Sequence, residues 1–297
     1  MQRICFSPSW STLLVVVMLG STALAQPPRA PLPLEPGGNR GEAVFPALEG
    51  WHRHEDGSFT IILGYFNRND EAVDIPVGPN NQILPGGPDL GQPTRFLAGR
   101  SWGVFAIDVP ADFADQRLTW AISINNQRSE VTFWLNPAYY VDPMLNRANG
   151  NVPPMLRVTS SDGDTLQGPA PSEPTASYTA SVGEPLELWA QVWDTPLTNP
   201  PPPRRRGRPT PPLTLSWRLY RGPADVAFRA PTEDGEADTD GYRREFDDLA
   251  GGETTTLVTF TEPGEYRLMA TANDVSGNGG GGDQCCWTTA HVDVTVR

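Results

Sequence analysis

The sequence predicts an all-β protein made of two consecutive β-sandwich domains. Three observations lead to this class. Apolar residues alternate with polar ones at a period of two along many short stretches, as expected for half-buried strands. Glycine and proline are abundant, with 29 Gly and 32 Pro among 297 residues, and they gather in the turns between those stretches. No long stretch shows sustained apolar spacing at the helical period, so packed helices are not expected.

The first 25 residues have the features of a secretory signal peptide. Arg3 precedes the short apolar run 13–19, and Ala23-Leu24-Ala25 supplies the small residues that a signal peptidase requires. We therefore expect cleavage before Gln26 and a secreted or periplasmic protein. The apolar run is too short to cross a bilayer, so no transmembrane anchor is expected.

The first sandwich domain is predicted over residues 41–145, after a proline-rich extended tether at 26–40. Alternating apolar residues mark one strand at 59–65 and another at 118–124. The second of these turns sharply and returns as a hairpin strand at 131–135. Glycine- and proline-rich turns separate the strands, which is typical of a sandwich.

The second sandwich domain is predicted over residues 155–297, after a short linker at 146–154. Its alternating stretches lie at 186–192, 213–219, 226–228, 254–260, 264–274 and 290–296. His291 falls between inward residues of the last stretch, so it is expected to be exposed. Trp217 is a candidate for burial, and short strands around a buried Trp fit an immunoglobulin-like sandwich.

Three stretches of the second domain carry a family resemblance. Trp217, residues 222–228 and residues 262–268 resemble the PKD-like branch of immunoglobulin-like domains over roughly 178–297. The Gly-Asp-Gly that follows the Trp in the standard PKD pattern is missing. The resemblance implies an extracellular interaction module and brings no catalytic residues. GYFNRN (64–69) and DQCCWT (283–288) are also similar to exported bacterial proteins of unassigned function.

Charge and cysteine usage restrict the partners and the chemistry. A net charge of −13 argues against a surface that grips nucleic-acid phosphates, so no nucleic-acid partner is expected. After the leader, Cys285 and Cys286 are the only cysteines. In an oxidising compartment such a pair closes as a vicinal disulfide, joins another chain or stays reduced. We predict the vicinal disulfide, as a structural clamp at the start of the last strand.

No catalytic constellation is visible, so the chain is expected not to be an enzyme. Residues 99–103 match the G-x-S-x-G pattern, but 104–109 continues as a strand where a nucleophile elbow needs a helix. His52 and His54 share a strand face and form an incomplete metal-ligand set. A third hypothesis is an enzyme whose two acidic residues come together from distant loops.

An acidic stretch partly matches a calcium-binding loop. Its candidate ligands are Glu236, Asp238, Asp240 and Asp247. The loop pattern requires Asp first and Glu last, between two helices, and here both ends differ and the helices are absent. A solvated acidic loop is the favoured interpretation, so no cofactor is expected unless calcium binds here.

Two features point to binding. A proline run is followed by four arginines that should dock to an anionic surface or an acidic protein: Arg204, Arg205, Arg206 and Arg208. Trp189 and Trp193 lie opposite the core face of their strand, ~13 Å apart, and such a stripe can stack on sugar rings. Cover by a neighbouring domain is the favoured alternative for the two Trp residues.

The long loops of the second domain suggest where binding takes place. Because strands alternate in direction, we expect loops 195–212, 229–253 and the glycine-rich loop before Cys285 to share one end. The leading hypothesis is therefore an interaction or adhesion module at the cell envelope that binds a protein or a glycan through this end. The alternative is a carbohydrate-binding accessory protein that uses Trp189 and Trp193.

Overall fold

The computed structural model describes residues 41–144, 150–196, 211–232, 236–274 and 287–297. All of them belong to one compact unit, Pro36–Arg297. The predicted leader, the tether and the first part of the linker lie outside the described residues, as do the four arginines from Arg204 to Arg208 and both candidate disulfide cysteines. No helix in the described ranges has the length and apolar character needed to cross a membrane.

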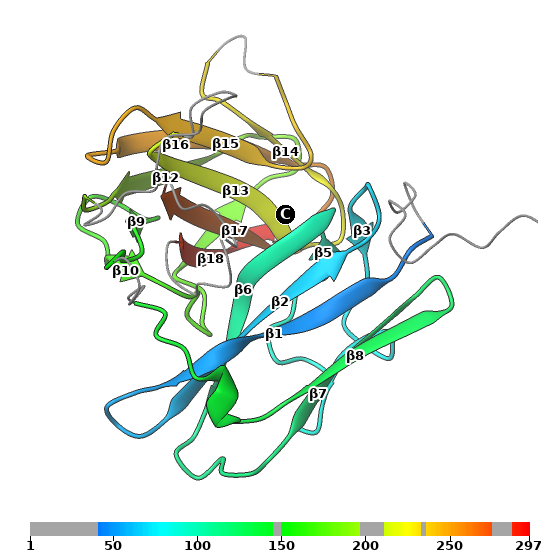
Figure 1. Cartoon of the computed structure of the whole chain (residues 1–297). Coiled ribbons are helices and arrows are strands. Elements are labelled where there is room, and N and C mark those ends of the chain that lie inside the picture. Colours follow the sequence, from blue (N-terminus) through cyan, green and yellow to red (C-terminus); the bar gives the residue numbers. More distant parts are fainter. Residues whose placement is uncertain (1–40, 145–149, 197–210, 233–235, 275–286) are drawn as a thin grey trace, which may run out of the picture. The chain divides into compact units, whose positions relative to one another are not determined.

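The first half of the chain folds into short antiparallel sheets. Its strands are β1 (Val44–Arg53), β2 (Phe59–Asn67), β3 (Val73–Asp74), β4 (Asn81–Leu84), β5 (Arg95–Phe96), β6 (Gly99–Val109), β7 (Leu118–Ile124) and β8 (Gln127–Phe133), followed by a short helical turn at Pro137–Tyr139. The sheets have the orders β1-β2-β6, β4-β7-β8 and β3-β5 (Figure 1). The first two enclose a core that includes Ile61, Leu63, Trp120 and Phe133, and we call this half the first sandwich.

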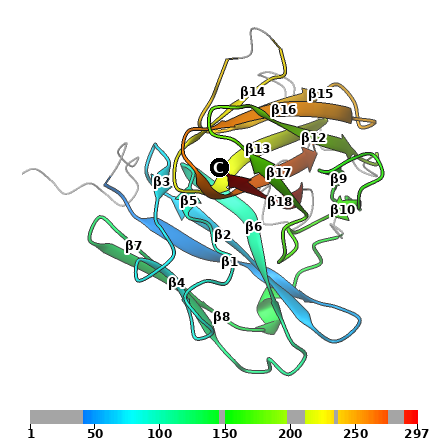
Figure 2. The same cartoon turned by 180° about the vertical axis from the view of Figure 1, so that it is seen from behind.

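The second half forms two five-stranded sheets, which we call the second sandwich. Its strands are β9 (Met155–Arg157), β10 (Leu166–Gln167), β11 (Ala176–Ala180), β12 (Leu186–Trp193), β13 (Leu213–Arg221), β14 (Val226–Arg229), β15 (Tyr242–Phe246), β16 (Gly252–Phe260), β17 (Gly264–Asp274) and β18 (Trp287–Val296). The sheet orders are β10-β9-β12-β16-β14 and β11-β18-β17-β13-β15 (Figures 1 and 2).

The inward residues of the two five-stranded sheets make one core. Trp217 is fully buried at its centre, as predicted, among the aliphatic side chains of β12, β17 and β18. β11 pairs in parallel with β18, and the other pairings in this half are antiparallel. The predicted fold class, all-β with consecutive β-sandwiches, is confirmed. The exact domain limits stay a prediction.

Two of the three long loops meet the second sandwich at the same end, as predicted. Leu213, the first residue of β13, pairs with Asp274, the last residue of β17. The loop before β13 and the loop after β17 therefore start from neighbouring positions. We call this the loop end of the second sandwich.

The third loop, 229–253, lies at the loop end only in its last part, so the prediction is wrong for its first part. Residues 247–251 connect Phe246, the partner of Leu213, to Gly252, the partner of Val192 near the end of β12. β15 divides residues 229–253, because Tyr242–Phe246 pairs with β13. Ahead of β15, Asp238 pairs with Phe228, which in turn pairs with Val258. Val258 lies opposite Leu186 at the start of β12, far from the loop end. The sequence YRREF gave no clear alternation, so this strand was not expected.

The two sandwiches touch through buried polar groups, which we call the joint. Nε2 of His291 lies 3.1 Å from the carbonyl oxygen of Val104 on β6. The hydroxyl of Tyr220 donates to the carbonyl of Gly91, and its ring stacks on His291 at 4.4 Å between centroids. Tyr220 also packs into the core of the first sandwich, as does Met269. The joint therefore combines apolar packing with directional bonds.

The expectation that His291 is exposed is wrong. Its side chain points away from the core of its own sandwich, as the alternation predicts, but only 2% of it is exposed because β6 covers it. Burial lowers the pKa of His291 to about 3, and the positive charge of Arg267 lowers it further. The ring is therefore neutral at physiological pH.

Candidate functional site

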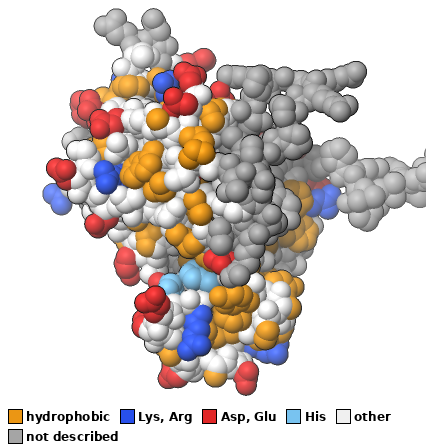
Figure 3. Space-filling model, turned by 60° about the vertical axis from the view of Figure 1, so that its left-hand side comes forward, with side chains coloured by type: hydrophobic (Ala, Val, Ile, Leu, Met, Phe, Trp, Pro, Cys, Tyr) orange, Lys and Arg blue, Asp and Glu red, His pale blue; other side chains and the backbone are white. Residues whose placement is uncertain are grey.

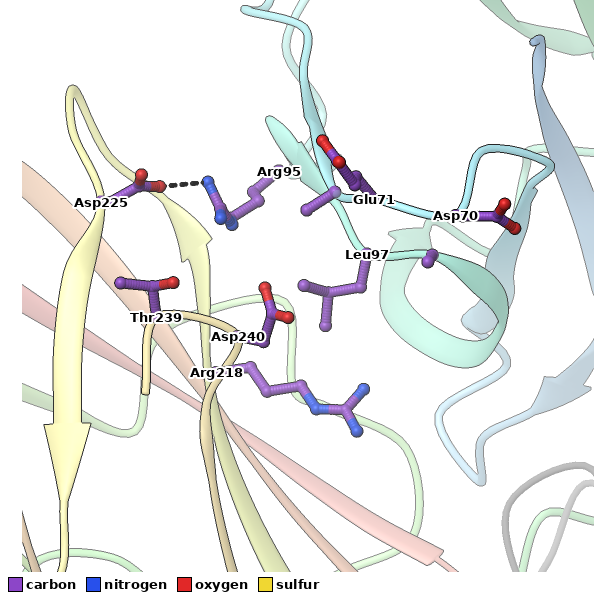
Figure 4. Close-up of a pocket in the computed structure, with 10 residues that line it drawn as sticks. Asp70, Glu71, Arg95, Leu97, Arg218, Asp225, Thr239 and Asp240 are labelled. Carbon is purple, nitrogen blue, oxygen red and sulfur yellow. Dashed lines mark hydrogen bonds and ion pairs between the residues drawn. The ribbon is translucent and has the colours of Figure 1, made fainter. Parts of the chain in front are cut away.

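A polar pocket of about 430 Å³ opens where the two sandwiches meet (Figure 4). Its labelled lining residues are Asp70, Glu71, Arg95, Leu97, Arg218, Asp225, Thr239 and Asp240. Arg95 is nearly buried, and its Nη1 binds Asp74 at 3.1 Å and Asp225 at 2.5 Å. This arginine links a carboxylate of each sandwich, so one wall of the pocket is a structural ion-pair network.

The described lining of this pocket is dominated by charged side chains. It holds carboxylates and guanidinium groups but no histidine, cysteine or serine. Figure 4 shows Arg218 extending from β13 beside Asp240, while Arg95 points to Asp225. The positive charge of Arg95 is already offset by the carboxylates of Asp74 and Asp225, to which it is bonded. The bonds of Arg95 to Asp74 and Asp225 link the two sandwiches at this pocket.

A second candidate surface lies on the outward side of the sheet that contains β12. Trp189, Gln191 and Trp193 alternate with the buried residues of β12 and are partly exposed. Arg157 on β9 is the register partner of Gln191, and its guanidinium lies 5.1 Å from the ring centre of Trp193. We call these four residues the tryptophan face. Figure 3 shows that hydrophobic side chains are interspersed with polar ones on the side of the molecule that it turns forward.

Hydrogen bonds hold Arg157 in place over the indole of Trp193. Its Nη1 donates to the carbonyl of Ser161 at 2.6 Å and to Oε1 of Gln191 at 3.3 Å, and its Nε donates to Thr165 at 2.9 Å. A guanidinium over an indole face is an attractive cation–π arrangement. The polar centre of the face is therefore ordered before any ligand arrives.

The favoured explanation for the two Trp residues, cover by a neighbouring domain, does not match the joint. The first sandwich lies against residues of β13 and β18, which belong to the opposite sheet. The tryptophan face keeps partial exposure on both indoles. The sequence identified Trp189 and Trp193 but missed Arg157, because the pairing of β9 with β12 leaves no mark in the local pattern.

The four residues of the expected calcium loop do not lie on one loop. Asp238 exchanges two backbone hydrogen bonds with Phe228, and Asp240 lines the polar pocket. β15 then separates both from Asp247, while Glu236 is exposed. Among the residues that the structure describes, no group of three or more His, Cys, Asp or Glu side chains is arranged to hold a metal.

The two histidines are close together, but among the described residues no third metal ligand joins them. The rings of His52 and His54 lie 4.8 Å apart, and burial followed by the charge of His54 lowers the pKa of His52. His54 Nε2 is 2.7 Å from Thr60 Oγ1, which donates to Asp108. This chain of bonds accounts for His54 as a structural residue.

The G-x-S-x-G stretch is not a nucleophile elbow. Ser101 lies in β6, pairs with Tyr65 of β2 and is buried. Because the chain continues as a strand on both sides of Ser101, its hydroxyl is not presented at a strand–helix turn.

The fold and its surfaces define an all-β protein of packed sheets, immunoglobulin-like in its second sandwich. No family model matches the chain, and no curated protein matches it. The D00-D0 domain of intimin aligns with a TM-score of 0.24 and 11% identity, over 86% of this chain and 100% of that chain. Domains 4 and 5 of the S-layer protein SbsC align with a TM-score of 0.22 and 8% identity, over 86% and 98%. The PapD-like domain 7 of human CEP192 aligns with a TM-score of 0.24 and 9% identity, over 56% and 98%. Scores this low identify neither a shared family nor a shared function.

Proposed function

We propose that the chain is an exported, non-catalytic interaction module that binds a carbohydrate at the cell envelope through the tryptophan face. The observation that carries this proposal is the pair of partly exposed indoles, Trp189 and Trp193, with Arg157 and Gln191 held between them. Their positions on one strand, β12, fix their spacing.

The chemistry of the tryptophan face fits a sugar chain better than a purely apolar partner. Indole rings offer apolar faces for the C–H faces of a pyranose and an N–H group for its hydroxyls. Gln191 and Arg157 add an acceptor and several donors within the same patch. A few placed polar groups among aromatic side chains are what ligand recognition requires.

Other residues support the exported and non-catalytic parts of the proposal. The leader-like residues 1–25 support export to the periplasm or the exterior. The strand conformation around Ser101 and the bonded state of His54 account for these two residues without catalysis. The four arginines from Arg204 to Arg208 remain a second predicted binding element for a protein or an anionic surface.

The test is binding of the purified mature protein to a panel of soluble and insoluble polysaccharides, by affinity electrophoresis and pull-down. We expect Trp189→Ala and Trp193→Ala each to weaken binding about tenfold or more, because aromatic anchors dominate such interfaces. Phe66→Ala is the matched control, since Phe66 is an aromatic side chain 42% exposed on the first sandwich.

Two outcomes contradict the proposal. One is that no polysaccharide binds; the other is that the double variant Trp189→Ala/Trp193→Ala binds as well as the unaltered protein. A variant that lacks residues 199–210 separates the two surfaces. If that deletion abolishes binding while the double variant retains it, the arginine-rich loop is the binding element.

A further inference from the structure

The positive charge of Arg157 on the tryptophan face is not neutralised by a carboxylate of the described chain. Its hydrogen bonds end on three neutral acceptors: the carbonyl of Ser161, Oε1 of Gln191 and Oγ1 of Thr165. The ion pairs between described residues do not include Arg157. Arg157 is half-buried and held against the indole of Trp193, so it presents a fixed positive charge to a ligand.

The same hydrogen bonds determine which donors of Arg157 are left for a ligand. Nε donates to Thr165, and Nη1 donates to Ser161 and Gln191. Among the residues that the structure describes, Nη2 has no hydrogen-bond partner, so both of its N–H groups are available. Because the other bonds fix the plane of the guanidinium, the direction of these two donors is set before a ligand binds.

A carboxylate on the other side of Gln191 gives the tryptophan face an electrostatic direction. Gln191 pairs with Arg157 on β9 and with Glu253 on β16, so the three residues form one row across the sheet. Two strand spacings place the charges of Arg157 and Glu253 on the order of 10 Å apart. Glu253 is exposed, and the ion pairs between described residues do not include it. An anionic group is therefore attracted to the β9 side of the row and repelled from the β16 side.

The charge of the whole chain makes this local positive charge informative. With a net charge of −13, the protein as a whole repels a polyanion. Binding of an acidic polymer would therefore require a particular positive site instead of general attraction. Arg157 supplies such a site beside the two indoles of the tryptophan face.

We propose that the tryptophan face selects an acidic glycan, in which a sugar unit at Arg157 carries a carboxylate or a sulfate group. The proposal rests on the proposed function, since the same two indoles hold the glycan. Nη2 of Arg157 donates to the anionic group, and Trp189 and Trp193 contact the apolar faces of the sugar rings. Glu253 excludes an anionic group from the opposite side of the row.

The experiment compares polysaccharides that differ only in charge. The purified mature chain is titrated with polygalacturonate and with its methyl ester, and separately with dextran sulfate and with dextran, in about 0.1 M NaCl, where the Debye length is about 10 Å. We expect the acidic form of at least one pair to bind about tenfold more tightly than its neutral form, and its binding to weaken as NaCl is added. The pair that shows this preference identifies the group as a carboxylate or a sulfate.

Charge variants on the same sheet locate the effect. Arg157→Gln should weaken binding of the acidic form about tenfold and leave binding of the neutral form unchanged. Glu253→Gln should strengthen binding of the acidic form by about two- to fivefold, because it removes a repulsive charge. The matched control is Arg229→Gln, since Arg229 is half-buried on β14, the edge strand three positions from β9 in the same sheet. At that distance its charge is screened, so binding should not change.

Three results would overturn the proposal: equal binding of the acidic and neutral forms in both pairs, undiminished binding of the acidic form by Arg157→Gln, or an equal loss in Arg229→Gln. Equal binding of both forms that is lost in Trp189→Ala/Trp193→Ala removes this inference and leaves the proposed function intact. If no polysaccharide binds, both fail. If deletion of residues 199–210 abolishes binding of the acidic form while Arg157→Gln retains it, the arginine-rich loop is the anion site instead. Circular dichroism checks the fold of each variant, and the comparison of charged and neutral polymers with the unaltered chain needs no variant.

Discussion

At neutral pH the buried ring of His291 carries no charge, and its protonation state is fixed by its surroundings. The carbonyl of Val104 can only accept a hydrogen bond, so Nε2 of His291 must carry the hydrogen. On the other side the ring stacks on Tyr220, and Arg267 lies close enough to oppose a second positive charge. Lowering the pH therefore protonates an imidazole ring that lies in the joint between the two sandwiches.

The cost of that charge follows from the two pKa values. The folded chain holds the pKa of His291 at about 3, against 6.5 for the free side chain. Below pH 6.5 the unfolded chain binds a proton that the folded chain does not, so stability falls as the pH falls. The loss grows by about 1.4 kcal/mol for each pH unit. At about pH 4.5 it amounts to roughly 2.7 kcal/mol, and it stops growing near the folded pKa.

The assay is urea unfolding of the unaltered protein and of His291→Gln at about pH 7 and about pH 4.5. Gln retains an N–H group that can donate to Val104 but does not titrate. Other acidic and basic groups, including His52, titrate equally in both proteins, so the difference between the two pH responses isolates His291. We expect the unaltered protein to lose roughly 2–3 kcal/mol more than the variant. Equal losses would refute the reasoning.

Two further predictions concern a buried contact within the first sandwich and one between the two sandwiches. Asn81→Ala should lower the free energy of unfolding, measured in urea, by roughly 2–4 kcal/mol. The reason is that buried Asn81 donates to the carbonyls of Ile75 and Pro93 and accepts a hydrogen bond from the indole of Trp120. The control is Asn80→Ala at an exposed position, and a loss for Asn81→Ala no larger than that of the control would contradict the prediction. Gly103→Ala should cost roughly 2 kcal/mol or more, because Gly103 has φ +51° and its added Cβ would lie 2.7 Å from Trp287. The control is Gly99→Ala, where φ is +82° and the added Cβ has no atom within 4 Å, so it measures only the cost of the backbone conformation. An equal Tm for the two glycine variants would exclude the clash with Trp287.

The period of two predicted most of the fold but could not show what lies over an outward face. His291 does point outward, as the alternation predicts, yet β6 of the other sandwich covers it. A local pattern distinguishes the two faces of a strand, whereas cover by a distant strand depends on how two finished sandwiches meet. The same reason explains why the aromatic stripe at Trp189 was expected to be covered and is partly exposed.

The residues of the candidate site could likewise be predicted only where local spacing along one strand was enough to place them. Trp189 and Trp193 were predicted from the sequence because their spacing alone places them on one face. Arg157 was not, since β9 joins β12 from a separate stretch.

The parallel pairing of β11 with β18 has a mechanical consequence. Ala176–Ala180 runs in the same direction as Val292–Val296, so the start of β11 and the end of β18 lie at opposite ends of one ladder. Tension between residue 175 and the C-terminus would load these hydrogen bonds along the strand direction, all at once, instead of opening them one after another. The second sandwich is therefore expected to resist stretching between these points more strongly than an antiparallel hairpin peeled apart from its open end.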